Sequence, residues 1–224
     1  MGGERLQSQT GVPPPESLAK LLGGRRGAID ATVPPVAFVI GWLAAGESVT
    51  IGAIAAIAAA ALIAGWRLAR GTKPRAALVG LLMVGVAALI VLRTGRAVDF
   101  FLVQLVTNLA SALAWLVSIT IRWPLLGVVV GAVLGQKTRW RRDPALLRAY
   151  SRGSWVWVLQ YAIRVAVFTP LWMADQVVAL ATARVVLTWP LVAACLAVSW
   201  WVVRAALPPD HPGLRHPVLP PSLA

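Results

Sequence analysis

Seven apolar stretches, separated by short segments rich in arginine, constrain the fold of this chain more than any other feature. They cover roughly residues 31–45, 49–66, 76–92, 98–121, 124–135, 154–174 and 176–203. A helix needs about 20 mainly apolar residues to cross a bilayer, with a lower limit of roughly 17. Six stretches reach that length, the first by borrowing flanking residues. The stretch 124–135 is too short and carries three glycines, so we predict an interfacial or re-entrant segment there.

The composition agrees with a membrane protein. Of the 224 residues, 58% are hydrophobic and 13% are charged, and the mean hydropathy is +0.75, which is far from the balance of a soluble domain. We therefore predict an all-α fold, a polytopic membrane helical bundle with about six transmembrane helices and one short interfacial or re-entrant segment. Residues 21–207 are expected to form a single transmembrane domain. A disordered cytoplasmic tail at 1–20 and a proline-rich, disordered cytoplasmic tail at 208–224 are expected to flank it.

The basic residues predict how the bundle is oriented. The formal net charge is +13, from 21 basic and 8 acidic residues. With six helices most of the lysines and arginines fall on one side of the membrane, and the opposite side keeps Arg93 and Arg96. The positive-inside rule then places both termini in the cytoplasm. A seventh span at 124–135 would move the basic segment "KTRWRR" to the outside, which is a further reason to reject it.

The same charge bias accounts for the segment "KTRWRRDPALLRAYSR", residues 137–152. We expect the cytoplasmic loops to lie on anionic phospholipid headgroups, at roughly 1 kcal/mol per basic residue near the surface. Nucleic acid also suits such charge, but no recognition motif accompanies it, so we predict no nucleic-acid partner. In "GGRRGAID", Arg25 and Arg26 are expected either to contact lipid on the inner side or to anchor the first helix there.

Two arginines and one amide are expected near the middle of the membrane. Arg164 lies ten residues before Ala174, and Arg184 lies nine residues after Asp175, on a hairpin that turns between them. At about 1.5 Å per residue, each lies roughly 14–15 Å below the outer end of a core about 30 Å thick. Asn108, nine residues into its own helix, reaches the same depth. A charged side chain at this depth costs at least about 2.5–3.5 kcal/mol.

No acidic residue lies at that depth in the sequence to neutralise the two arginines. Four arrangements remain open: snorkelling toward Asp99 and Asp175, bonds to carbonyls freed by Pro170 or Pro190, a water-filled cavity, or a bound anion. The helix at 98–121 also carries one continuous stripe that must face protein or water: Gln104, Asn108, Ser111, Trp115 and Ser118. Interhelical hydrogen bonding would satisfy this stripe without any ligand.

From these residues we predict a polar cavity between the helices at 98–121, 154–174 and 176–203 that binds an anionic group. Its expected ligand-binding residues are Arg164, Arg184, Asn108, Gln104 and Arg93. At the outer mouth we expect ion pairing among Arg96, Asp99 and Asp175, which would equally serve as an interface anchor and a helix cap.

Other chemistry is absent from the sequence. Both histidines lie in the C-terminal tail, there is no glycine loop of the Walker type, and no paired acids suit magnesium. We therefore predict no metal site, no cofactor and no catalytic residue, so that the protein is not an enzyme. Cys195, inside an apolar run, is expected to be a small core residue.

Five segments, taken in order, resemble a family of small actinobacterial integral membrane proteins, domain of unknown function family 3159. They are "LLGGRRGAIDATVPPVAF", "RTGRAVDFF" followed by an asparagine in the next helix, "RWPLLG", "WRRDPALLRAYSR" and "ARVVLTWPL". The resemblance runs from about residue 22 to 207, although Val103 and Gln104 stand where members often have Pro-Gly. More distantly, the layout is similar to the intracellular septation protein A family. The resemblance implies the plasma membrane of a bacterium and an envelope role, and it implies no substrate or catalytic residue.

Three functions are compatible with the sequence. The first is a multi-pass plasma-membrane protein that binds or transports an anionic small molecule or lipid headgroup. The alternative is a structural or scaffold protein of the cell envelope or septation machinery, which would need its basic loops for partners but not midplane arginines. The third is an intramembrane enzyme that acts on a phosphorylated lipid, for which no general base or metal ligand is found.

Overall fold

The computed structural model describes residues 24–71 and 74–218. The secondary structure within these ranges is helical, and no strand is formed there. The expected tail at 1–20 and the side chains of Arg25 and Arg26 lie outside the described residues. In chain order the elements are α2 (Gly24–Ala44), α3 (Val49–Ala69), α4 (Pro74–Thr94), the 3-10 helix η1 (Ala97–Phe101), α5 (Leu102–Thr120), α6 (Leu125–Val133), the 3-10 helix η2 (Arg139–Arg142), α7 (Pro144–Met173) and α8 (Val177–Ala205).

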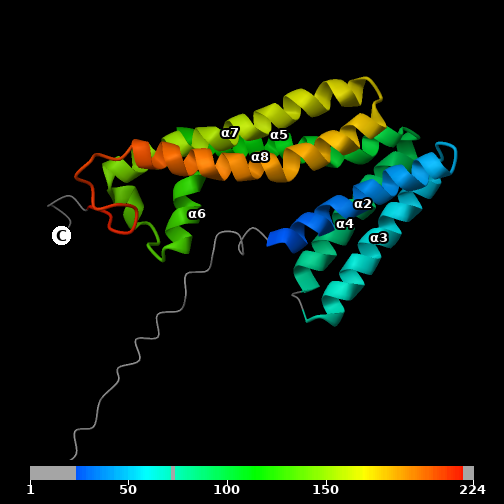
Figure 1. Cartoon of the computed structure of the whole chain (residues 1–224), viewed down its shortest axis with the longest axis horizontal. Helices are drawn as coiled ribbons and strands as arrows, with labels where there is room; N and C mark the ends of the chain where they lie inside the picture. Colours follow the sequence, from blue (N-terminus) through cyan, green and yellow to red (C-terminus); the bar gives the residue numbers. More distant parts are fainter. Residues whose placement is uncertain (1–23, 72–73, 219–224) are drawn as a thin grey trace, which may run out of the picture.

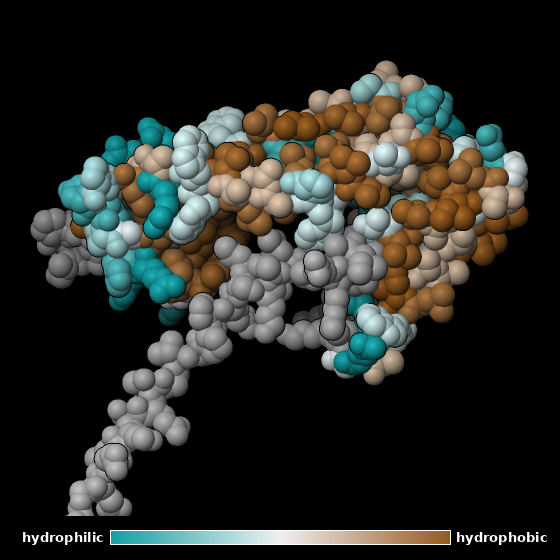
Figure 2. Space-filling view, in the orientation of Figure 1, coloured by the Kyte–Doolittle hydropathy of each residue, from teal (hydrophilic) through white to brown (hydrophobic). Residues whose placement is uncertain are grey.

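Four helical segments are long and apolar enough to cross a membrane: Val49–Ala69, Ala97–Thr120, Pro144–Met173 and Val177–Ala205. The apolar runs described in α2 and α4, Thr32–Ala44 and Leu78–Thr94, are shorter. Figure 2 shows hydrophobic residues over the long flanks of the molecule and hydrophilic residues gathered toward its ends. The prediction of an all-α fold is confirmed. Apolar surface of this extent is what a bilayer covers, so the structure is consistent with the predicted membrane protein. The number of six spans stays a prediction.

The long helices form two groups of three, α2 with α3 and α4, and α5 with α7 and α8 (Figure 1). The groups meet beside the turns at 45–48, 95–96 and 174–176 and separate away from them. A hydrophobic core fills this junction, where the ring of Phe38 in α2 stacks on Phe100 in η1 with centroids 4.2 Å apart. We call this the junction end of the molecule.

A second, smaller core lies at the opposite end of α7 and α8, which we call the basic end (residues 120–152 and 196–207). Trp140 of η2 is 1% exposed and packs edge-on against Tyr150. An ideal Cβ on Gly127 or Gly131 of α6 would lie only 2.6 Å or 2.5 Å from the indole. Two of the three glycines in the short apolar stretch therefore let Trp140 close on α6. With nine residues, α6 is too short to cross a bilayer.

Replacing Gly131 with alanine is expected to lower the free energy of unfolding by about 1–3 kcal/mol, because the added methyl overpacks a rigid ring. Thermal melting of the detergent-solubilised protein would measure the loss. Gly65→Ala in α3 is the matched control: a Cβ there meets nothing within 4 Å, so helix propensity alone should make that change neutral or stabilising. Equal losses in both variants would contradict close packing of Trp140 on α6.

The C-terminal segment differs from expectation. The proline-rich composition predicts a disordered tail from residue 208, but residues 208–218 lie against the basic end in a fixed, irregular conformation. Their contacts with Asp143 and Gln136 satisfy polar groups that are buried in the folded domain. Polar contacts to partners far away in sequence, rather than local propensity, order this segment.

Candidate functional site

Arg164 is buried where α7 packs on α8. Its side chain is 8% exposed, and Nη2 donates hydrogen bonds to the carbonyl oxygens of Leu187 at 2.9 Å and Thr188 at 3.3 Å. Both carbonyls shortly precede Pro190, which lacks a backbone N–H and disturbs the helical hydrogen bonding just before it. Among the four arrangements open to the two arginines predicted near the midplane, Arg164 adopts bonds to backbone carbonyls.

Arg184 lines a cavity of about 270 Å³ between the two helix groups. Gln104 and Thr107 of α5 and Arg67 of α3 are the other polar side chains on its wall. Small residues of α3 and α4 leave this space open: Ala60, Ala64 and Gly80. We call this the inter-group cavity. It combines apolar walls with two guanidinium groups and one amide.

The inter-group cavity has a different position from the one predicted. The expectation placed both midplane arginines in a space between α5, α7 and α8. Arg184 and Gln104 instead face the space toward α2, α3 and α4, whereas Arg164 turns to α8 and Arg93 is exposed at the end of α4. Sequence position determines the depth of a residue along a helix, but helix rotation and the choice of neighbours depend on packing.

Several buried polar atoms of α5 and α7 have no hydrogen-bond partner among the described residues, and three of them belong to amide or guanidinium groups. These three are Asn108 Nδ2, Gln160 Oε1 and Arg164 Nε, and we call this group the polar seam. Asn108 is 1% exposed, and its Oδ1 accepts a hydrogen bond from Gln104 Nε2 at 3.2 Å, which links the seam to the cavity wall. Buried polar atoms are normally bonded to protein or ordered water, so the seam suits water or polar ligand atoms.

Gln160 is a member of this site that the sequence analysis missed. It is 2% exposed and lies four residues before Arg164 on the same helix. The sequence did contain a signal for Gln160. Residues four apart share one helix face, and an amide beside an arginine predicted near the midplane needs the same protection from lipid.

At the junction end, Arg96, Asp99 and Asp175 come together as one polar cluster. Arg96 Nη2 lies 2.8 Å from Asp175 Oδ1, and Arg96 Nη1 lies 3.9 Å from Asp99 Oδ1. The hydrogen bonds that Arg96 donates to the Asp175 carboxylate raise the pKa of Arg96 above its ordinary value. Trp172, which the sequence analysis did not name, donates from Nε1 to Asp99 Oδ1 at 2.9 Å. Its indole also stacks under the Arg96 guanidinium at 5.1 Å.

Replacing Trp172 with phenylalanine is expected to lower the free energy of unfolding by about 1–3 kcal/mol. Asp99 is 4% exposed, so loss of the indole N–H removes a donor from a buried carboxylate. Arg96→Gln is the comparison, and we expect a much smaller change because the Arg96–Asp175 pair is exposed and screened. Thermal melting of both variants would show which one loses more stability. A larger loss in Arg96→Gln than in Trp172→Phe would contradict this expectation.

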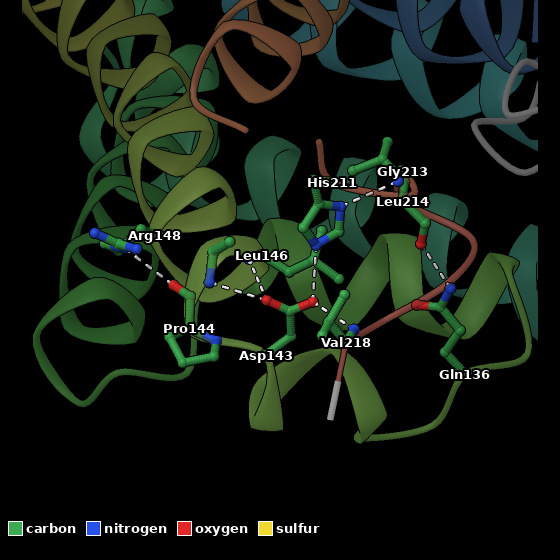
Figure 3. A network of polar contacts seen from close by, with 10 residues as sticks. Gln136, Asp143, Pro144, Leu146, Arg148, His211, Gly213, Leu214 and Val218 are labelled. Carbon is green, nitrogen blue, oxygen red and sulfur yellow. Dashed lines mark hydrogen bonds and ion pairs between the residues drawn. The ribbon is translucent and has the colours of Figure 1, made fainter. Parts of the chain in front are cut away.

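The basic end holds a second polar network, built around Asp143 (Figure 3). Asp143 Oδ1 accepts from the backbone N–H groups of Ala145 and Leu146 and caps α7. Oδ2 accepts from the Val218 N–H at 2.7 Å and lies 2.9 Å from His211 Nε2. Close by, Gln136 Nε2 donates to the Leu214 carbonyl at 2.6 Å. One carboxylate thus joins the start of α7 to the C-terminal segment.

The hydrogen bonds of this network determine where Asp143 and His211 carry their protons. Burial raises the pKa of Asp143, but hydrogen bonds from His211 and from the amides of Val218, Leu146 and Ala145 outweigh burial and hold that pKa below its ordinary value. The Gly213 N–H donates to His211 Nδ1 at 3.0 Å, so Nδ1 acts as an acceptor. The neutral imidazole that fits both contacts carries its proton on Nε2 and donates it to Asp143.

No cluster of three or more histidine, cysteine, aspartate or glutamate side chains that could hold a metal ion occurs within the described part of the chain. The polar side chains described above act through hydrogen bonds and charge. They lie in three places: the inter-group cavity with its polar seam, the cluster at the junction end, and the network at the basic end.

Comparison with known proteins gives one positive result. No curated protein and no solved structure matches the chain. A family profile does match, over residues 22–210, which include every helix described above from α2 to α8 but only the first three residues of the C-terminal segment 208–218. The chain therefore belongs to the family described as "Protein of unknown function (DUF3159)".

Proposed function

We propose that this protein binds, and moves across the membrane, an anionic small molecule or lipid headgroup that occupies the inter-group cavity. The observation that carries the proposal is the position of Arg184 on the wall of that cavity, within the long apolar helix α8. In the proposed arrangement six helices cross the plasma membrane of a bacterium, and the charge bias puts both termini in the cytoplasm.

The charge and shape of the inter-group cavity support an anion. A guanidinium within a membrane span costs at least about 2.5–3.5 kcal/mol, and such residues usually mark a ligand or ion pathway. Arg67 adds a second positive charge to the same wall, and Gln104 adds amide groups that bond to oxygen atoms. Since α3 ends two residues after Arg67, the cavity extends from that end of α3 toward Arg184. The positive-inside rule makes this the cytoplasmic side.

Arg164 has a positioning role in this proposal. Its hydrogen bonds hold the carbonyls of Leu187 and Thr188, which lie one turn after Arg184 on α8. They therefore fix the segment of α8 that carries Arg184, next to a proline where a helix is easily bent. The polar seam and the Gln104–Asn108 hydrogen bond connect Arg164 to the other side of the cavity wall.

Native mass spectrometry of the protein extracted in native membrane discs would test this proposal. We expect an acidic adduct on the wild type that Arg184→Gln loses. Arg93→Gln removes an exposed arginine of α4 that does not line the cavity, and it should keep the adduct. A full set of the wild-type acidic adducts on Arg184→Gln, or no acidic adduct on a folded wild type, would refute ligand binding in the inter-group cavity.

A scaffold of the cell envelope remains the second candidate, favoured by one observation. Exposed arginines are concentrated at the basic end: Arg122, Arg139, Arg141, Arg142, Arg148 and Arg152. An acidic protein partner at the membrane surface would pair with them. Neutralising Arg139 and Arg152 to glutamine would then abolish co-purification of that partner, whereas Arg184→Gln would leave it intact.

A further inference from the structure

A second cavity, of about 520 Å³, lies at the basic end between α6, α7, α8 and the C-terminal segment. Most of its wall is apolar, with Leu126 and Val130 from α6 and Leu196 and Trp200 from α8. It shares no lining residue with the inter-group cavity. Its volume falls in the range of about 300–1,000 Å³ that is usual for small-ligand sites. We call it the basic-end cavity.

The polar groups of the basic-end cavity are few and of complementary kinds. Tyr150 lines it and is fully buried at 0% exposure, yet its hydroxyl has no hydrogen-bond partner among the described residues. Arg204 and Arg215 are exposed at the rim, and the guanidinium of Arg204 lies over the Trp200 ring at 4.9 Å from its centroid. Ser199 also lines the cavity, but its hydroxyl donates to the Gly153 carbonyl. An apolar interior with the unbonded Tyr150 hydroxyl and two cations at the edge matches an amphiphile with an anionic head.

The wall formed by the C-terminal segment is held in place at two points. His211 and Val218 bond to Asp143, and the Leu214 carbonyl accepts from Gln136. These contacts lie on either side of Arg215, so this cation is presented by a fixed segment of backbone. The basic-end cavity is therefore a preformed site, and little conformational entropy would be lost on binding.

We infer that the basic-end cavity binds one anionic phospholipid. An acyl chain packs against Leu126, Val130 and Leu196, and the phosphate pairs with Arg204 and Arg215. The Tyr150 hydroxyl donates to an ester or phosphate oxygen and so gains the partner that it otherwise lacks. A water-soluble phosphate would leave the apolar wall uncovered, which is why a lipid fits better than a free anion. This site is independent of the proposed function.

The test uses full-length protein in nanodiscs that contain equal amounts of phosphatidylglycerol and phosphatidylcholine, released for native mass spectrometry. We expect one phosphatidylglycerol on the wild type, with retention reduced about tenfold or more in Arg204→Gln/Arg215→Gln. Arg139→Gln/Arg152→Gln removes the same charge from exposed positions at the same end outside the cavity, and retention should not change. Tyr150→Phe keeps the ring and should weaken retention through loss of the hydroxyl alone.

Filling the space gives a second, independent variant. Val130→Trp should expel the lipid without removing any charge, because Val130 is on the cavity wall. Equal retention of the two lipids by the wild type, or equal loss in the two arginine pairs, would overturn specific recognition of an anionic head. Undiminished retention in both Arg204→Gln/Arg215→Gln and Val130→Trp would overturn the site itself. Arg184→Gln should keep this lipid, which separates the outcome from that of the proposed function.

Discussion

Replacing Trp140 with alanine is expected to lower the free energy of unfolding by about 3–5 kcal/mol, the usual loss for a buried aromatic side chain. Trp140 is 1% exposed and fills the space between the glycine face of α6 and the ring of Tyr150. Because α6 has only nine residues and few other large contacts, the cavity left by the indole would loosen its packing on α7. Denaturant titration in detergent micelles would measure the loss.

Trp140→Phe is the matched control for this prediction. The indole Nε1 of Trp140 is buried without a hydrogen-bond partner among the described residues. The packing of the ring, and not its N–H group, therefore stabilises the folded protein. Phenylalanine keeps an aromatic ring against Gly127 and Gly131, and we expect it to retain most of the stability. If the phenylalanine variant were as unstable as the alanine variant, the N–H would have a bonding role that contradicts this account.

The sequence predicted the linear arrangement of this fold well. The short stretch at 124–135 corresponds to α6 (Leu125–Val133), and the break expected around "RTGRAVD" corresponds to the turn between α4 and η1. Helix lengths and breaks follow from apolar runs, glycines and prolines, which are local properties of the chain. Local properties also suffice for the cluster at the junction end, because Arg96 and Asp175 lie at turns and Asp99 lies in the short helix η1 directly after one of them.

What the sequence could not predict is how the helices rotate and pair. Arg164 and Arg184 were assigned to one cavity from their depth alone, but the first bonds to α8 and the second lines the inter-group cavity. Inside a bilayer no difference in hydrophobicity between lipid and helix surface fixes the rotation, so packing and interhelical hydrogen bonds decide it. Those depend on several helices at once, and a single sequence does not reveal them.

The C-terminal segment illustrates the same limit at the basic end. Its prolines and polar residues predict disorder, because such a composition buries little apolar surface. Its order comes from a carboxylate on another element, Asp143, which lies 68 residues before His211. Half of its role, the cap of α7, follows the local preference of aspartate for helix N-termini, although the sequence analysis did not name it. The other half depends on contacts across the fold.

Replacing Asp143 with alanine is expected to lower the free energy of unfolding by about 2–4 kcal/mol and to release the C-terminal segment. Loss of the cap of α7 accounts for about 1 kcal/mol, and loss of the hydrogen bonds from His211 and Val218 accounts for the rest. Trypsin should then cleave after Arg215 faster than in the wild type. Unchanged cleavage would show that the segment is held without Asp143.

Asp143→Asn separates the two roles of this carboxylate. The amide oxygen can still cap α7, but the amide NH₂ would face the Val218 N–H and the Nε2 proton of His211, so donors would meet donors. His211 cannot adapt by moving its proton to Nδ1, because the Gly213 N–H already points there. We therefore expect the asparagine variant to lose the C-terminal contacts and to keep about 1 kcal/mol more stability than alanine.

The pH dependence of the wild type follows from the lowered pKa of Asp143. In the folded protein that pKa lies below its ordinary value of about 3.9. As the pH falls, Asp143 is therefore protonated in the unfolded chain before it is protonated in the folded protein. The stabilisation is thus fully present above that value and is lost as the pH falls from about 4 through the lower pKa of the folded state. A spin label on Pro209→Cys should become mobile over that range in the wild type, whereas in Asp143→Asn it should already be mobile at neutral pH. A label that stays immobile in acid would mean that the C-terminal segment does not depend on the Asp143 carboxylate.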